Sequence, residues 1–213
     1  MKQSTEIIFQ EYAARYGFVQ NAEEVLRQAL DTLESAYLAG GKLLVCGNGG
    51  SCADADHIVG ELVKSFRIHR PLEAELKEAF ETVGGRSELA DKLEGGLPAI
   101  SLCAHTALMT ALINDIGADY VYAQQVVGYG KKEDVLLGIS TSGNSKNILF
   151  AGEAAKAKGM KTIGLTGREG GRMREQFDLV ICADADATEN VQDMHSVFYH
   201  ILCAALENEF WGE

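Results

Sequence analysis

The sequence has little of what marks membrane, secreted or nucleic-acid-binding proteins. Its apolar runs fall well short of the ~20 residues that cross a bilayer. Its first residues, Met1 to Glu6, lack the charged-then-apolar pattern of a signal peptide. The formal net charge is −12, which argues against nucleic acid as the main partner because phosphate backbones attract surfaces rich in lysine and arginine. We therefore expect a cytoplasmic protein that binds neither nucleic acid nor a membrane.

Cysteine and proline are also scarce. The five cysteines are odd in number and form no CxxC pair, and four of them lie in or beside apolar stretches. This pattern favours reduced thiols over disulfides or a zinc–thiolate site. The two prolines, Pro71 and Pro98, bracket one segment near the middle of the chain.

Short apolar runs alternate with helical patterns along the 213 residues, of which 46% are apolar. This alternation predicts βαβ units, so we expect a single α/β domain over residues 1–213, a three-layer sandwich with a five-stranded, mainly parallel sheet. Helical periodicity predicts a long N-terminal helix over residues 1–39 and a C-terminal helix from Glu189 to Trp211. The strands are expected near residues 42–47, 98–104, 134–140, 161–166 and 178–183.

The segment over residues 67–97 does not fit a minimal βαβ unit. It holds two polar helical patterns, Leu72–Thr82 and Ser87–Leu93, separated by Gly84-Gly85. We expect an inserted helical segment, which is either a surface excursion or a lid over a site.

Two turns rich in glycine and hydroxyl residues carry the strongest functional signal. Each follows an apolar β-like run and opens onto a helical pattern: Cys46-Gly47-Asn48-Gly49-Gly50-Ser51, and Ser140-Thr141-Ser142-Gly143-Asn144-Ser145. Such turns offer backbone N–H groups at the positive end of a helix dipole, with hydroxyl donors beside them. Two of them in one short chain predict a phosphorylated small molecule held between them.

His57 and Glu61 follow the first turn at helical i, i+4 spacing, so both lie on one face of the predicted helix. This spacing suits a shared metal ion, an acid–base pair or an ion pair on the helix surface. The pair lies two to three turns past the phosphate-type turn, roughly the reach of a sugar phosphate. In contrast, Asn114-Asp115 by its chemistry alone indicates a turn.

Taken together, the two turns, the pair His57 and Glu61, and Gln192 with His200 resemble the phosphoheptose isomerase branch of the sugar-isomerase (SIS) domain family. The similarity covers nearly the whole chain. The inserted segment departs from the shorter enzymes of that branch. The resemblance implies a SIS fold and a homotetramer with sites built at subunit interfaces.

The resemblance also implies roles for individual residues. One zinc ion per subunit would be held by His57, Glu61, Gln192 and His200. Glu61 and His200 would be the acid–base pair. The substrate-contacting positions would be Asn48, Gly49, Gly50, Ser51, Glu61, Asn114, Asp115, Ser140, Thr141, Ser142, Ser145 and Gln192.

The spacing of Gln192 and His200 conflicts with a shared ion, because eight residues of helix span about 12 Å. Either Gln192 lies at an irregular start of the helix, or the ligands come from different subunits. His195, one turn from Gln192, is a competing candidate for the fourth ligand.

The expected activity is the isomerisation of sedoheptulose 7-phosphate to D-glycero-D-manno-heptose 7-phosphate by proton transfer through an enediol. It would feed nucleotide-activated heptose synthesis. Two alternatives stand beside it: an isomerase of another sugar phosphate, and a non-catalytic SIS module that binds a sugar phosphate or a protein such as a replication initiator.

Overall fold

The computed structural model describes residues 1–84 and 87–213, and a five-stranded sheet lies at its centre. All strand pairs are parallel, in the order β2-β1-β3-β4-β5. Both faces of β1 and β3 are buried, which explains why these strands read as continuous apolar runs. The expected sheet is confirmed, with β1 Leu43–Gly47, β2 Ala99–Ser101, β3 Val135–Ile139, β4 Lys161–Thr166 and β5 Leu179–Cys182.

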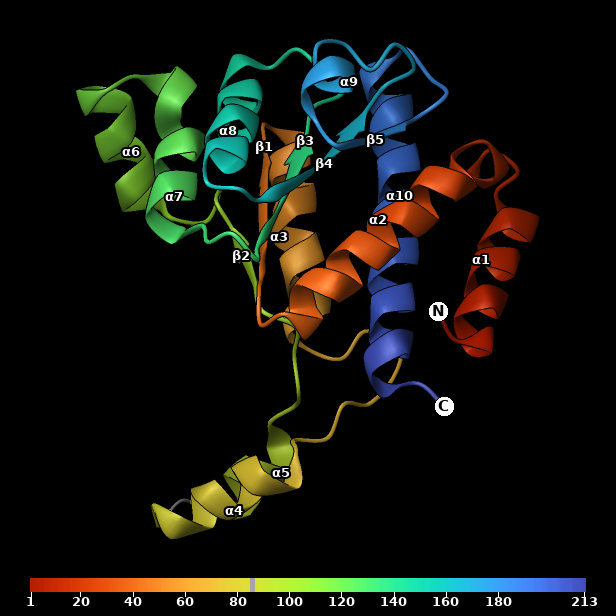
Figure 1. Ribbon diagram of the computed structural model, residues 1–213, viewed down its shortest axis with the longest axis vertical. Helices are drawn as coiled ribbons and strands as arrows, with labels where there is room; N and C mark the ends of the chain where they lie inside the picture. Colours follow the sequence, from red (N-terminus) through yellow and green to blue (C-terminus); the bar gives the residue numbers. More distant parts are fainter. Residues whose placement is uncertain (85–86) are drawn as a thin grey trace.

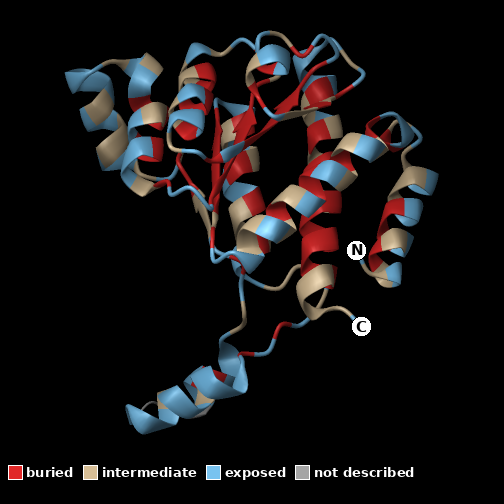
Figure 2. Ribbon diagram, viewed as in Figure 1, coloured by how far each residue is buried: buried red, intermediate tan, exposed pale blue. Residues whose placement is uncertain are grey.

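Helices cover both faces of the sheet, which gives the expected three layers (Figure 1). On one face lie α2 Val19–Leu38, α3 Gly50–Val63 and α10 Thr188–Trp211, with α1 Gln3–Arg15 outside them. The other face carries α6 Thr106–Asp115, the 3-10 turn η1 Ala118–Tyr120, α7 Val121–Tyr129, α8 Lys146–Ala157 and α9 Met173–Gln176. Buried residues concentrate on the strands and on the helix sides that face them (Figure 2).

The N-terminal segment is two helices, so the expectation of one helical run over residues 1–39 is wrong. The chain leaves the helical conformation at Tyr16, which is extended, and resumes it after Phe18. The rings of Tyr16 and Phe18 lie 5.8 Å apart, and Phe18 packs edge-on against Phe198 of α10. This packing of aromatic side chains on α10 turns the chain between α1 and α2.

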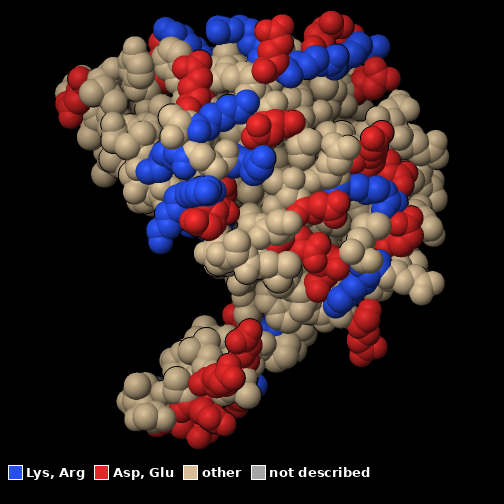
Figure 3. Space-filling view, in the orientation of Figure 1, with Lys and Arg blue, Asp and Glu red and all other residues tan. Residues whose placement is uncertain are grey.

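The inserted segment forms an arm, defined here as residues 72–93, that stands away from the rest of the molecule (Figure 1). It contains α4 Ala74–Thr82 and α5 Ser87–Lys92. Gly84 has a φ of 69°, as a turn requires, while Gly85 lies outside the described residues. Acidic side chains cover much of the visible arm surface (Figure 3). The arm follows the C-terminal end of α3 and leads away from the glycine turns of its own chain, as an excursion and not as a lid over them.

The two glycine and hydroxyl turns lie side by side at the carboxyl edge of the sheet. Gly47, at the end of β1, pairs in register with Ile139 at the end of β3. The connection from β1 leads to β2 on one side and that from β3 to β4 on the other, so the strand order reverses between them. Open α/β sheets bind their ligands at such a switch point. Among the described residues, no helix is both long and apolar enough to cross a membrane.

Candidate functional site

The first turn joins the end of β1 to the start of α3 at the carboxyl edge of the sheet. Gly49 has a φ of 58°, a conformation that glycine adopts without strain. A Cβ at Gly47 would lie 2.3 Å from the carbonyl oxygen of Ser51, so the close turn leaves no room for a side chain. α3 begins at Gly50, and Ser51 lies buried in its first turn. The turn thus places the N-terminal end of α3 at the carboxyl edge of the sheet, a position that suits an anion.

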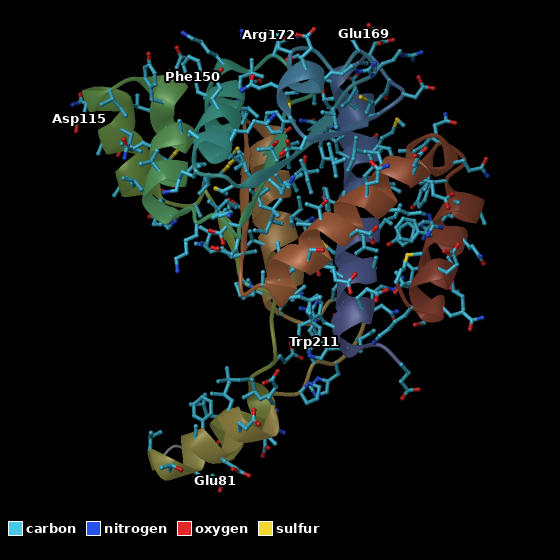
Figure 4. The ribbon with its side chains drawn as sticks, viewed as in Figure 1. Glu81, Asp115, Phe150, Glu169, Arg172 and Trp211 are labelled. Atoms are coloured by element: carbon cyan, nitrogen blue, oxygen red, sulfur yellow. The ribbon has the colours of Figure 1, made fainter. Side chains whose placement is uncertain are left out.

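The second turn brings its hydroxyl groups together. The Ser140 hydroxyl donates to Ser145 Oγ at 2.9 Å and lies 3.5 Å from Ser142 Oγ. Ser145 immediately precedes α8, so its hydroxyl lies at the N-terminal end of that helix. Asn144 Oδ1 accepts a hydrogen bond from the backbone N–H of Arg172 at 3.0 Å. This bond fixes the turn against the loop before α9, where Arg172 lies (Figure 4).

A pair of asparagines joins the two turns. Asn48 Nδ2 donates to Asn147 Oδ1, and Asn147 Nδ2 donates to Asn48 Oδ1, both at 2.9 Å. Asn48 is predicted from the sequence but Asn147 is not, because nothing in the sequence pairs residues 99 positions apart. Asn147 is the second residue of α8, which begins at Lys146. A polar residue in the first turn of a helix that follows a phosphate-type turn is the signal that could have identified it.

A stripe along α3 faces α10. Gly50, Asp54, His57 and Glu61 lie on one side of α3 by helical geometry. A Cβ at Gly50 would lie 2.3 Å from Gln192 Nε2, so Gln192 packs directly on the first turn. Because Gln192 meets Gly50 and His200 meets His57, the two helices run in the same direction along this contact.

His57, Glu61 and His200 lie together at the far end of this stripe. His57 Nε2 and Glu61 Oε1 are 3.1 Å apart, and the rings of His57 and His200 lie 5.0 Å apart. The Glu61 side chain is 13% exposed against 45% for His57, so the carboxylate lies inside the cluster. The Glu61 carboxylate lies beside His57. His57 is six residues past Ser51, so the two residues are separated by about 9 Å along the axis of α3.

Aromatic residues enclose the cluster. Phe66 stacks on His200 with ring centroids 5.6 Å apart, and Tyr199 lies edge-on to His200 at 4.8 Å. The Tyr199 hydroxyl lies 3.2 Å from His57 Nδ1 and donates to Asp54 Oδ1 at 3.3 Å. Tyr199 therefore orients the His57 ring from the side opposite Glu61.

Burial shifts the proton affinities in this cluster. Desolvation lowers the pKa of His200, the nearby His57 lowers it further, and the Glu61 charge opposes both effects. Burial also raises the pKa of Asp54, against the Tyr199 hydrogen bond and the His57 charge. His200 is therefore held largely as neutral imidazole at neutral pH.

Three of the four residues expected to hold zinc belong to this cluster: His57, Glu61 and His200. Two imidazoles and a carboxylate are the donor types of zinc sites. As the side chains lie, no group of three or more His, Cys, Asp or Glu residues in the described part of the chain is arranged to hold a metal ion. Gln192 lies at the other end of the stripe, and it lies inside regular helix because α10 begins at Thr188. An irregular helix start therefore does not bring Gln192 to His200.

His195 is enclosed in the protein core. It has no exposed surface, and its Nε2 lies 3.0 Å from the carbonyl oxygen of Thr166 at the end of β4. Burial lowers the pKa of His195 to about 4, with the Thr166 hydrogen bond acting in the opposite direction. Its side chain faces β4 and not the His57 cluster, which removes it as a competing ligand.

Asn114 and Asp115 lie apart from the rest of the predicted site. They end α6, both are exposed, and the Asn114 amide donates to the Asp115 carboxylate at 2.8 Å. Asp115 is at the outer end of α6, on the side of the molecule away from α10 (Figure 4). Within one chain, these two residues do not meet the turns or the His57 cluster.

Comparison with known proteins shows the family of the chain. A family model described as the SIS domain matches residues 9–95 and 77–167. A phosphoheptose isomerase of Helicobacter pylori (strain P12) is 41% identical over 192 residues, covering 90% of this chain and 88% of that protein. The chain belongs to the phosphoheptose isomerase family of SIS domain proteins.

Other members of the phosphoheptose isomerase family show the same extent of similarity. One from Akkermansia muciniphila is 38% identical and covers 89% of this chain and 86% of its own. The structure of a phosphoheptose isomerase from Francisella tularensis is similar with a TM-score of 0.76 and 31% identity, covering 98% of this chain and all of that chain. The structure of the enzyme from Neisseria gonorrhoeae has a TM-score of 0.70 and 32% identity, covering 94% of this chain and 98% of that chain.

Proposed function

We propose that this protein is an aldose–ketose isomerase that converts sedoheptulose 7-phosphate to D-glycero-D-manno-heptose 7-phosphate, for nucleotide-activated heptose synthesis. The observation that carries the proposal is the pairing of a phosphate-type switch point with an acid–base cluster about 9 Å along the same helix. Membership of the phosphoheptose isomerase family supports it.

The two turns are proposed to anchor the phosphate end of the sugar. The amides at the start of α3 and the hydroxyl groups of the second turn provide donors that need no net positive charge. The contacts are assigned to Asn48, Gly49, Gly50, Ser51, Ser140, Thr141, Ser142 and Ser145, with Gln192 beside the first turn. When the phosphate end is anchored, the carbonyl end of the sugar lies toward the His57 cluster.

Glu61 and His200 are proposed to move the protons. Glu61 removes the proton from C1 of the ketose, and His200 donates a proton to the carbonyl oxygen at C2, which gives the enediol. Glu61 then returns a proton to C2, while His200 takes the proton from the oxygen at C1, which gives the aldose. A neutral imidazole suits both steps, because it can donate a proton to the oxygen at C2 and accept one from the oxygen at C1.

We also propose that His57, Glu61 and His200 hold a zinc ion, with Gln192 as the fourth ligand from another subunit. When bound, zinc would polarise the substrate's oxygen atoms and offset the charge of the enediolate. The donor chemistry supports this proposal.

A homotetramer with sites at subunit interfaces is proposed as the working form. α6 is largely apolar in sequence yet has no buried residue, and Ile113, Ile116, Tyr120 and Val127 are exposed on and beside it. A second chain over this surface would bury it and would bring Asn114 and Asp115 to a neighbour's site. The phosphorylated substrate and five free cysteines lead us to propose a cytoplasmic location.

The proposal is tested by incubating metal-replete and chelator-treated protein with sedoheptulose 7-phosphate and following aldose formation. We expect turnover in the metal-replete sample and slower turnover after chelation. Equal rates would remove the zinc proposal, and no turnover in either sample would favour a non-catalytic module. Light scattering after gel filtration tests the tetramer, since four chains of 23.0 kDa give about 92 kDa.

A further inference from the structure

A buried ion pair lies beneath the His57 cluster. Arg70 and Glu207 are both fully buried, and Arg70 Nε donates to Glu207 Oε1 at 2.7 Å. The guanidinium group also lies over the Trp211 ring, 4.8 Å from its centroid. Neither charged residue stands out in the sequence, because they lie 137 positions apart.

Arg70 holds the end of α3. Its NH1 group donates to the carbonyl oxygen of Leu62 at 2.7 Å, and its NH2 group donates to that of Glu61 at 2.9 Å. The last carbonyls of a helix have no partner within the helix, so the planar guanidinium satisfies two of them at once. One of these carbonyls belongs to the proposed base, whose backbone is thereby fixed.

Glu207 holds the opposite side of the cluster. Its two carboxylate oxygens accept hydrogen bonds from the backbone N–H groups of Phe66, Arg67 and Ile68, at 2.8, 2.7 and 3.0 Å. Phe66 is the residue that stacks on His200. Glu207 lies seven residues past His200 on α10, which puts both on one side of that helix about two turns apart.

The ion pair therefore connects the supports of both proposed catalytic groups. A buried ion pair is expensive to desolvate, and an apolar pair of similar shape often gives equal stability. What an apolar pair cannot do is bind two helix-end carbonyls and three loop amides simultaneously. We propose that Arg70 and Glu207 are positioning residues that fix Glu61 relative to His200, an inference that rests on the proposed roles of those two residues.

The test compares Arg70→Lys and Glu207→Gln with a variant of another buried ion pair. Lysine keeps the charge of Arg70 but lacks the fork that reaches several acceptors. Glutamine keeps the shape of Glu207 but replaces one acceptor oxygen by a donor. The control is Asp134→Asn, because Asp134 is buried, pairs with Lys42 at 2.5 Å and accepts the backbone N–H groups of Lys42 and Lys131 just before β3, without contacting α3 or residues 65–70.

All three variants are expected to unfold at lower temperature than the wild type. In Arg70→Lys and Glu207→Gln, kcat should fall by about tenfold or more, because small displacements of catalytic groups have large effects on rate. KM should change by less than about twofold, since the phosphate turns are untouched. Asp134→Asn should leave both constants within about twofold of wild type at a temperature where it is folded.

Hydrogen exchange of the segment 61–68 is measured on the same proteins, without substrate. The proposal requires faster exchange there in Arg70→Lys and Glu207→Gln but not in Asp134→Asn. Unchanged exchange in both variants, or a fall in kcat no larger than that of the control, would overturn the proposal. If Arg70→Lys does not fold, Glu207→Gln decides. If the wild type shows no turnover, the proposed function fails and the exchange data alone decide the positioning role.

Discussion

At the scale of single residues, the burial of His195 makes the stability of the folded protein depend on pH. His195 is neutral in the folded protein because its ring is enclosed and its pKa is lowered to about 4. An unfolded chain gives a histidine its ordinary pKa of ~6.5. Between these two values the unfolded state binds a proton that the folded state does not, so stability falls as the pH falls.

We predict that His195→Gln weakens this dependence. Glutamine keeps a donor for the Thr166 carbonyl but does not titrate. Between pH 7 and pH 5 the wild type should lose about 2 kcal/mol of unfolding free energy through His195, and His195→Gln should lack this loss. Urea unfolding at both pH values, at one protein concentration, measures it. The control is His69→Gln at an exposed position; an equal slope in wild type and His195→Gln would contradict the prediction.

We predict that Asn147→Ala weakens substrate binding more than turnover. It removes both hydrogen bonds that join the two turns, so the phosphate donors lose their fixed spacing. KM should rise about three- to tenfold with kcat little changed, the size expected for one or two partly exposed hydrogen bonds. Steady-state kinetics measure both constants, with Asn21→Ala, at an exposed position of α2, as the control. A fall in kcat at constant KM would point to a role in the chemistry.

At the scale of helices and strands, much of the fold could be predicted from the sequence. Strands buried on both faces must be apolar throughout, so β1 and β3 could be predicted from their apolar runs. The glycines that follow these runs indicated the turns. The break at Tyr16–Phe18 could not, because it depends on aromatic packing against Phe198, 180 residues away. The same holds for the contact of Gln192 with Gly50, which requires the packing of α10 on α3.

We predict that the arm can be removed without loss of the fold. Its two ends already meet, because Pro71 and Glu94 form a β-bridge and the Gly95 N–H donates to the Arg70 carbonyl at 2.7 Å. Among its described residues only Leu72 and Ala90 are buried. Replacing residues 74–92 by a short Gly-Ser linker should leave circular dichroism typical of the α/β fold. The melting temperature should shift by less than about 4 °C; a much larger drop would contradict the prediction.

At the scale of the whole molecule, substrate anchoring and proton transfer are proposed to occur at opposite ends of the α3 stripe. The turns at the sheet edge are proposed to hold the phosphate, and the cluster around Glu61 is proposed to move the proton. Most residues at both places could be named from the sequence. The sequence could not show that Asn114 and Asp115 lie on the far layer, since that follows only from the position of α6.

The most direct test of this account is the reaction run in D2O, with the product analysed by NMR. Because Glu61 is partly exposed, the proton it takes from C1 should exchange with solvent before return. We predict deuterium at C2 of the aldose in the wild type, and neither product nor deuterium exchange at C1 of the ketose with Glu61→Gln of intact fold. Product formed by the wild type without deuterium, or by Glu61→Gln at a near-normal rate, would contradict the account.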